Sequence, residues 1–139
     1  MRKSALLVGL VALSAITAGN AAVTAYKSTL NAGAEVPPVN SKATGSAAVN
    51  VDSATKQASW RVDYSGLSGP ATAAHIHCGA AAGANAGVAV NFGSNLASPI
   101  QGSGAMTDAQ LADLAAGKCY VNIHTEANKG GEIRGQLAP

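Results

Sequence analysis

The sequence predicts an all-β fold: a Greek-key-like antiparallel β-sandwich or barrel of about eight strands with one short helix. Short apolar or alternating segments recur at turn-like spacing, and glycine, proline, asparagine and serine separate them. In one segment Trp60 and Val62 alternate with Arg61 and Asp63, as in a strand buried on one face. We expect strands at 23–30, 45–52, 58–64, 72–77, 87–92, 100–106, 118–124 and 132–137.

One segment departs from the strand pattern and predicts a short helix at about 107–116. Thr107 and Gln110 have the spacing of a capping box, in which each side chain bonds the backbone amide of the other residue. Leu111 and Leu114 then fall on one helical face, and Gly117 ends the segment. We expect this helix to pack over the core between two strands and to have no catalytic role.

Length and composition limit the classes of protein. The 139 residues suit one domain, and charged residues make up only 12% of the chain. This charge content excludes a coiled coil, a basic nucleic-acid-binding arm and a charge-rich disordered chain. Aromatic residues make up 4%, so small residues must fill most of the core.

The first 21 residues have the layout of a secretory signal peptide. Arg2 and Lys3 precede the apolar segment 4–18, and small residues follow it. We expect cleavage near residues 21–25 and a single mature domain over 22–139; a retained N-terminal anchor is the alternative. Without Arg2 and Lys3 the chain has seven basic and seven acidic residues, so no nucleic-acid partner is expected. No later apolar run is long enough to span a membrane, and we expect a periplasmic or extracellular protein.

Cys78 and Cys119 are the two cysteines of the sequence. In an oxidising compartment two cysteines most simply form one disulfide. Strand parity places both on the apolar sides of their strands, which fits a disulfide on the core side. A free Cys78 beside His77 is the alternative, because a thiolate there would tighten a copper or zinc site.

The three histidines lie in two of the expected strands. Residues i and i+2 of a strand project from the same face, so His75 and His77 point together. On the second strand His124 shares its face with Asn122 and Tyr120. If the strands are neighbours, three imidazoles converge and suit Cu(II) or Zn(II), with a fourth position left to water, a carboxylate or a substrate. The metal affinity should fall below about pH 6.5, where imidazoles gain protons.

The same histidines also fit a role without metal. A pair of histidines on a strand is often a solvated or hydrogen-bonded polar face. The absence of any other histidine and the matching parity of His124 favour the metal site. Other chemistry has little support: no Gly-x-Ser-x-Gly elbow occurs, and the glycine- and alanine-rich segment 79–87 lacks the lysine and the following helix of a phosphate-binding loop.

A series of short motifs runs in order through the chain. They are LNAGAEVPPV at 30–39, ATG at 43–45, YSGLSG at 64–69, AAHIH at 73–77, SPI at 98–100, YVNIHT at 120–125 and GGEIRGQL at 130–137. This series resembles the CHRD domain, which is repeated in the animal protein chordin and occurs singly in exported bacterial proteins. The resemblance covers residues 28–137 and implies an all-β fold. It does not by itself imply a function.

The resemblance also bears on the cysteines and on the last strand. Members of the family commonly carry glycine where this chain has Cys78, and Cys119 also departs from the usual residue. Because this chain differs from the family at both positions by having a cysteine, we expect a disulfide that is specific to this protein. Glu132 and Arg134, in the closing motif, share one strand face. We expect them to form an ion pair at the sheet edge, with the orientation of a histidine ligand as the alternative.

Three functions remain open from the sequence. The first is an exported module that carries or buffers copper or zinc through His75, His77 and His124. The second is a structural or adhesive domain of the cell envelope that uses no metal. The third is a redox enzyme, because the His-x-His strand is loosely similar to Cu/Zn superoxide dismutase. A bridged Cu/Zn pair uses about six imidazoles and a carboxylate, whereas this sequence has three histidines, so we expect a metal-binding protein before an enzyme.

Overall fold

The computed structural model describes residues 22–139, and the expected signal peptide at 1–21 lies outside the described residues. As predicted, the fold is all-β, and every strand prediction is confirmed to within one residue at each end. The elements in chain order are β1 (Val23–Asn31), the 3-10 turn η1 (Ala32–Ala34), β2 (Thr44–Asp52), β3 (Gln57–Ser65), β4 (Ala71–Cys78), β5 (Val88–Asn91), β6 (Ile100–Ala105), α1 (Asp108–Ala115), β7 (Cys119–Thr125) and β8 (Ile133–Gln136).

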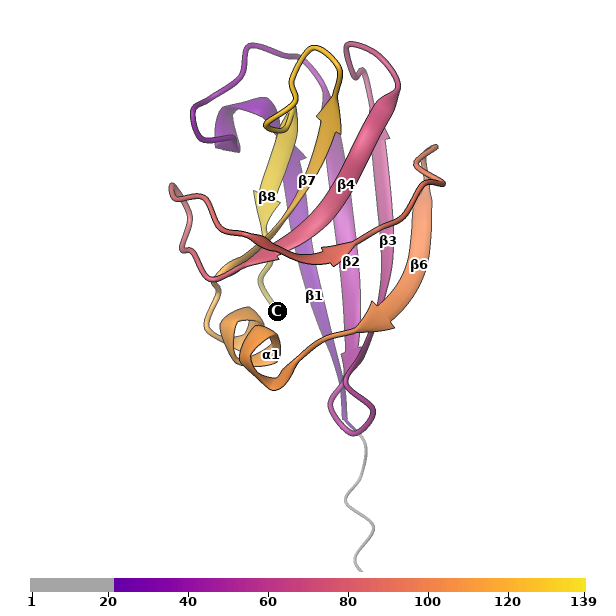
Figure 1. The fold of residues 1–139 in the computed structure, drawn as a ribbon, viewed down its shortest axis with the longest axis vertical. Coiled ribbons are helices and arrows are strands. Elements are labelled where there is room, and N and C mark those ends of the chain that lie inside the picture. Colours follow the sequence, from indigo (N-terminus) through magenta and orange to yellow (C-terminus); the bar gives the residue numbers. More distant parts are fainter. Residues whose placement is uncertain (1–21) are drawn as a thin grey trace, which may run out of the picture.

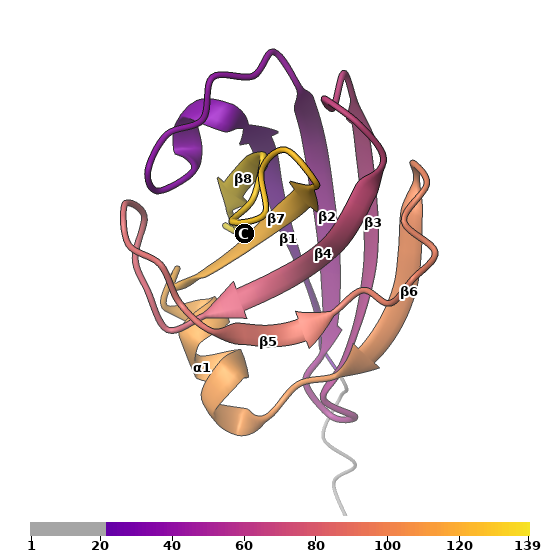
Figure 2. The same cartoon turned by 45° about the horizontal axis from the view of Figure 1, so that its top comes forward.

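The eight strands form one antiparallel sheet in the order β5-β4-β7-β8-β1-β2-β3-β6. The β1–β2 and β2–β3 pairs are neighbours in sequence, whereas β4–β7, β3–β6 and β1–β8 join strands that are far apart. The sheet curls into a nearly closed barrel in which the edge strands β5 and β6 approach each other (Figures 1 and 2). This connectivity agrees with the Greek-key-like prediction.

Aromatic side chains fill the space near the two edge strands. Trp60 of β3 stacks on Phe92, with ring centroids 4.6 Å apart. The Trp60 indole also covers Gly102 of β6, where an added Cβ atom would lie 2.8 Å from Trp60 Cζ2. Small and aliphatic side chains make up most of the remaining core, including the fully buried Leu30, Val49, Val62, Ile76, Ile100, Ile123 and Ile133.

The helix α1 begins at the predicted capping box. The Gln110 amide donates to Thr107 Oγ1 at 3.2 Å, and the Thr107 amide donates to Gln110 Oε1 at 2.9 Å. Leu114 is buried in the core, and Gly117 follows the helix with a φ of 74°, a conformation that glycine adopts without strain. The predicted helix and its packing role are therefore confirmed.

The faces of β4, β7 and β8 that point away from the hydrophobic core are polar, yet they are covered. The cover is the segment 79–87 between β4 and β5. His77 bonds the carbonyl oxygen of Ala86 at 2.8 Å, and Arg134 donates to that of Ala84 at 2.5 Å. Both side chains are buried. The molecule therefore has a second, polar interior beside its apolar core.

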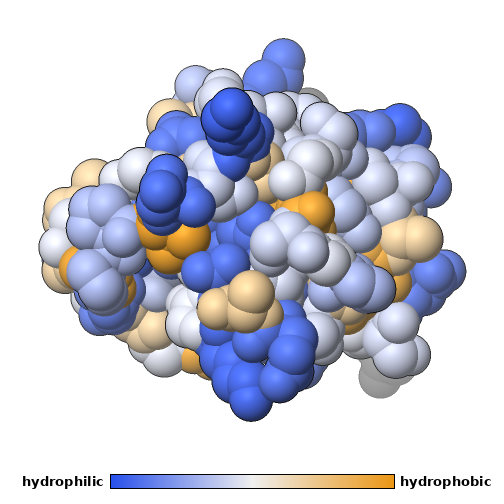
Figure 3. Space-filling model, turned by 90° about the horizontal axis from the view of Figure 1, so that it is seen from above, coloured by the Kyte–Doolittle hydropathy of each residue, from blue (hydrophilic) through white to orange (hydrophobic). Residues whose placement is uncertain are grey.

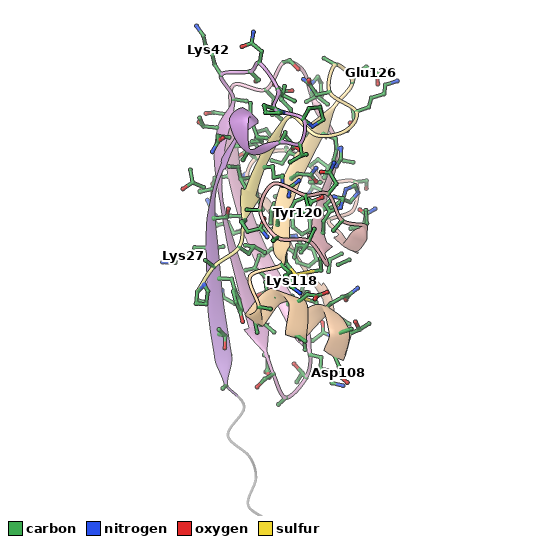
Figure 4. All side chains as sticks on the ribbon, turned by 90° about the vertical axis from the view of Figure 1, so that its left-hand side faces the viewer. Lys27, Lys42, Asp108, Lys118, Tyr120 and Glu126 are labelled. Carbon is green, nitrogen blue, oxygen red and sulfur yellow. A yellow bond between two sulfur atoms is a disulfide. The ribbon has the colours of Figure 1, made fainter. Side chains whose placement is uncertain are left out.

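The end of the molecule seen from above is mostly hydrophilic, with small and separate apolar patches (Figure 3). Lys42 and Glu126 project from this end, and Asp108 lies at the opposite end (Figure 4). Within residues 22–139, no helix is long and apolar enough to cross a membrane.

Candidate metal centre

The three histidines lie on two adjacent strands, as predicted. β4 pairs antiparallel with β7, with His75 opposite Asn122 and His77 opposite Tyr120. His124, two residues beyond Asn122, projects from the same face of β7. The strand register thus gathers all three imidazoles on one face.

The ligand nitrogens of the three histidines all lie within 4.8 Å of one another. His75 Nδ1 and His124 Nε2 are 3.1 Å apart. Two nitrogens bound to one tetrahedral ion at about 2.1 Å are about 3.4 Å apart. A separation of 4.8 Å would therefore close by about 1.4 Å on binding, which side-chain rotations supply. The three residues can hold a single metal ion.

Backbone carbonyl groups orient two of the imidazoles. His77 Nδ1 lies 2.8 Å from the carbonyl oxygen of Ala86, and His124 Nδ1 lies 2.8 Å from that of Lys129. A carbonyl oxygen only accepts hydrogen bonds, so His124 Nδ1 carries the proton in the neutral ring and Nε2 keeps its lone pair. His77 faces an acceptor at both nitrogens, the Ala86 oxygen and Asn122 Oδ1, and binds a metal ion through Nε2 when the proton is on Nδ1. Histidine ligands of metals are oriented in this way through their other ring nitrogen.

The surroundings of His75 and His124 lower the pKa values of both imidazoles. Burial, and then the charges that His124 and His77 would carry, lower the pKa of His75 to about 4. Burial also lowers the pKa of His124, and the neighbouring His77 adds to this against the opposing effect of the Lys129 carbonyl. Near neutral pH His75 and His124 are therefore uncharged, as a ligand must be.

A stack of side chains lies against the cluster. The rings of His77 and Tyr120 are nearly parallel, 5° apart in orientation and with centroids 4.7 Å apart. The Arg134 guanidinium lies 3.4 Å from the centre of the Tyr120 ring, a cation–π contact. Figure 4 shows Tyr120 inside the body of the molecule. This packing restricts the rotation of His77.

Cys78 and Cys119 face each other in register and form the predicted disulfide. Their positions are next to the His77–Tyr120 pair on the same two strands. A disulfide sulfur is not a thiolate, so neither cysteine is available as a metal ligand. The alternative in which Cys78 joins the histidines is therefore wrong for this structure.

The expected ion pair between Glu132 and Arg134 is not formed, and β8 is an inner strand of the sheet. The Glu132 carboxylate accepts bonds of 2.7–2.9 Å from the hydroxyls of Ser41, Ser68 and Thr125 and from the Ser68 amide. Burial raises the pKa of Glu132, but these hydrogen bonds outweigh it and lower the pKa to about 2. Glu132 reaches the histidine strand through Thr125.

Arg134 also takes a different place from the one predicted. It donates to Asn85 Oδ1 at 2.9 Å and to the Ala84 carbonyl, and it covers Tyr120. The reason is that the segment 79–87 folds back over β8 and supplies acceptors that sequence spacing does not reveal. Arg134 therefore supports the His77 side of the cluster through Tyr120.

Two residues of the site were not singled out from the sequence as candidates. Asn122 is 2% exposed, and its Oδ1 lies 3.0 Å from His77 Nε2. Glu35 is 4% exposed beside it and lines a cavity of about 400 Å³ together with Arg134. Burial raises the pKa of Glu35 to about 7, although the Arg134 charge and a hydrogen bond from Asn122 oppose the rise. The alternation of side chains along β7 predicts that Asn122 shares a face with His124. The sequence around Glu35 contains no signal that this residue joins the site.

The family of the chain follows from a comparison with known protein families. The CHRD domain family matches residues 26–137, which is nearly the whole described part of the chain. Among curated proteins and among solved structures, none matches the chain. The match includes every strand that carries or supports the histidines, apart from the first three residues of β1. The chain belongs to the CHRD domain family.

Proposed function

We propose that this protein is an exported metal-binding module that carries or buffers Cu(II) or Zn(II) through His75, His77 and His124. The observation that carries the proposal is the convergence of three imidazole nitrogens within 4.8 Å, two of them oriented by backbone carbonyls.

The chemistry of the donors supports copper or zinc. Neutral imidazole suits both ions, and the order of divalent affinities favours Cu(II). The low pKa values of His75 and His124 keep their lone pairs available at neutral pH. The disulfide removes thiolate sulfur, which would have favoured Cu(I).

Titration of the purified protein with Cu(II) or Zn(II) against a competing chelator tests the proposal. We expect one ion per chain, and His77→Ala and His124→Ala should each weaken binding at least about tenfold, since each removes one of three ligands. Asp108→Asn is the matched control, because Asp108 is exposed at the end of the molecule opposite Glu126, which follows His124 by two residues, and should leave binding unchanged. Equal affinities for the wild type and a variant without histidines would overturn the proposal. The structural or adhesive role in the cell envelope, which needs no metal, would then be the remaining function.

We also propose that the protein is exported and that residues 1–21 are removed. The disulfide supports this, because disulfides persist in oxidising compartments outside the cytosol. The intact mass and the N-terminal sequence of the exported fraction test it. The mature chain should begin near residues 22–26, and an N-terminus at Met1 in exported material would overturn the proposal.

A further inference from the structure

Asn122 occupies the middle of the histidine face. It lies opposite His75 across the strand pair and two residues before His124 on its own strand, and its Oδ1 is 3.0 Å from His77 Nε2. The side chain is 2% exposed, so water does not solvate the carboxamide freely. Asn122 is therefore positioned to act on the same ion as the histidines.

His77 lies between two hydrogen-bond acceptors. Nδ1 faces the Ala86 carbonyl oxygen and Nε2 faces Asn122 Oδ1, but the neutral ring has one proton for these two contacts. With the proton on Nδ1, as binding of a metal ion through Nε2 requires, the Nε2 lone pair faces Oδ1. A carboxamide oxygen is also only an acceptor. In a buried site two facing acceptors repel unless a positive charge, a proton or a metal ion, lies between them.

The separation of these two atoms is suited to a shared metal ion. Two ligand atoms at about 2.0 Å from one ion, seen from it at about 90–110°, are about 2.8–3.3 Å apart. The observed 3.0 Å between Nε2 and Oδ1 falls in this range. The geometry is therefore that of two adjacent ligands.

Glu35 prevents the carboxamide from turning over. A half-turn of the amide would remove the repulsion by pointing its NH₂ at His77. Asn122 Nδ2, however, lies close to the Glu35 carboxyl group, and a turned amide would place Oδ1 against that carboxyl instead. Asn122 Nδ2 and Glu35 Oε1 both press against Gly131, where an added Cβ would collide with both atoms, so little room is left for rearrangement.

We propose that Asn122 Oδ1 is the fourth ligand of the metal ion and that Glu35 is the positioning residue that holds it there. This inference rests on the proposed metal-binding function. The resulting set of three nitrogens and one oxygen contains no soft sulfur and suits a divalent ion. Glu35 also places a carboxyl group beside an otherwise neutral set of ligands.

The test is titration with Cu(II) chloride, with the Cu(II) EPR spectrum recorded for each protein. Asn122→Leu removes the oxygen at nearly constant volume and should weaken Cu(II) binding at least about tenfold with a changed spectrum. Glu35→Gln should weaken binding less, because the amide can then turn. Adding Asn122→Asp to Glu35→Gln exchanges the amide and carboxyl groups, restores an oxygen toward the ion and should return the affinity at least to that of the wild type.

The outcomes separate this inference from the proposed function. If the wild type binds no Cu(II), both are overturned. If His77→Ala weakens binding while Asn122→Leu retains the affinity and spectrum of the wild type, the function stands and the fourth ligand is overturned. Should Asn122→Leu fail to fold, ¹³C-labelled wild type decides: Zn(II) should move the Asn122 Cγ resonance downfield, and an unmoved resonance in the Zn(II)-loaded protein overturns the inference.

Discussion

Cys78 and Cys119 lie directly opposite each other, and their disulfide joins the two strands that carry all three histidines. Replacing both cysteines by alanine should lower the free energy of unfolding by about 3–4 kcal/mol, because the bond closes a loop across a sequence separation of 41. His77 is the neighbour of Cys78, so looser strand ends should also weaken metal binding. Urea unfolding followed by Trp60 fluorescence measures the first effect.

Reduction of the wild type provides the control for this double variant. The reduced protein should unfold at about the same urea concentration as the variant without cysteines. An unchanged midpoint in both, or two free thiols titrating in the native air-exposed protein, would contradict the stabilising disulfide.

The Glu132 carboxylate predicts a specific acid sensitivity. Its pKa is about 2 in the folded protein, against 4.5 as its ordinary value. The unfolded chain therefore binds the proton more readily, and the stabilisation is complete above about pH 4.5 and is lost as the pH falls through 2. The loss amounts to about 3 kcal/mol, measured by urea unfolding at pH 7, 4, 3 and 2.

Two variants identify the source of this slope. Glu132→Gln cannot ionise, so it should be less stable at pH 7 and should lose this part of the slope below pH 4.5. Ser41→Ala removes one donor and so raises the pKa of Glu132 in the folded protein, so the decline should still begin near pH 4.5 but should end at a higher pH and be smaller than in the wild type. A wild-type slope that persists in Glu132→Gln would show that other carboxylates cause it.

Strand bounds were predictable here because two local signals coincide. Alternation marks the buried face, as at Trp60 and Val62, and glycine or proline ends most segments. The capping box at Thr107 likewise depends on residues three positions apart. Strand parity placed the imidazoles on one face, and the structure confirms the pairing of β4 with β7 that brings them together.

The covering of that face could not be predicted in the same way. The segment 79–87 holds His77 and Arg134 with backbone carbonyls of Ala86 and Ala84, and a carbonyl has no side-chain signature. The glycine- and alanine-rich composition of this segment gives no sign that it covers a polar face. Glu35 meets Asn122 only through tertiary folding, since 87 positions separate them. Predicting such contacts requires the path of the loops.

The metal-free protein should show a strongly shifted titration of His75. Its pKa is about 4, because burial and then the neighbouring His124 and His77 oppose its charge. The unfolded chain takes up this proton near pH 6.5, so the stability of the metal-free protein should fall as the pH drops from 6.5 to 4. Protonation of His75 should then compete with metal binding only near pH 4, below the 6.5 expected for an ordinary imidazole.

Proton NMR of the His75 ring measures this shift directly. The resonance is assigned with His75→Gln, and the same residue in urea should titrate near 6.5 as an internal reference. A midpoint near 6.5 in the folded protein would contradict the buried, charge-poor cluster.

The contact between Gly102 and Trp60 provides a local test of how the barrel closes. It lies opposite Trp60 on the edge strand β6, and an added Cβ atom would meet the indole at 2.8 Å. Because the indole also stacks on Phe92 at 4.6 Å, it cannot move without losing that contact. Gly102→Ala should lower the free energy of unfolding by about 1–3 kcal/mol and shift the fluorescence of Trp60, the one tryptophan of the sequence.

Gly87→Ala is the matched control, because a Cβ there meets nothing within 4 Å and should leave both readouts unchanged. Equal stabilities for the two variants would mean that Trp60 yields freely, and the aromatic pair would then not be what holds the edges of the sheet together.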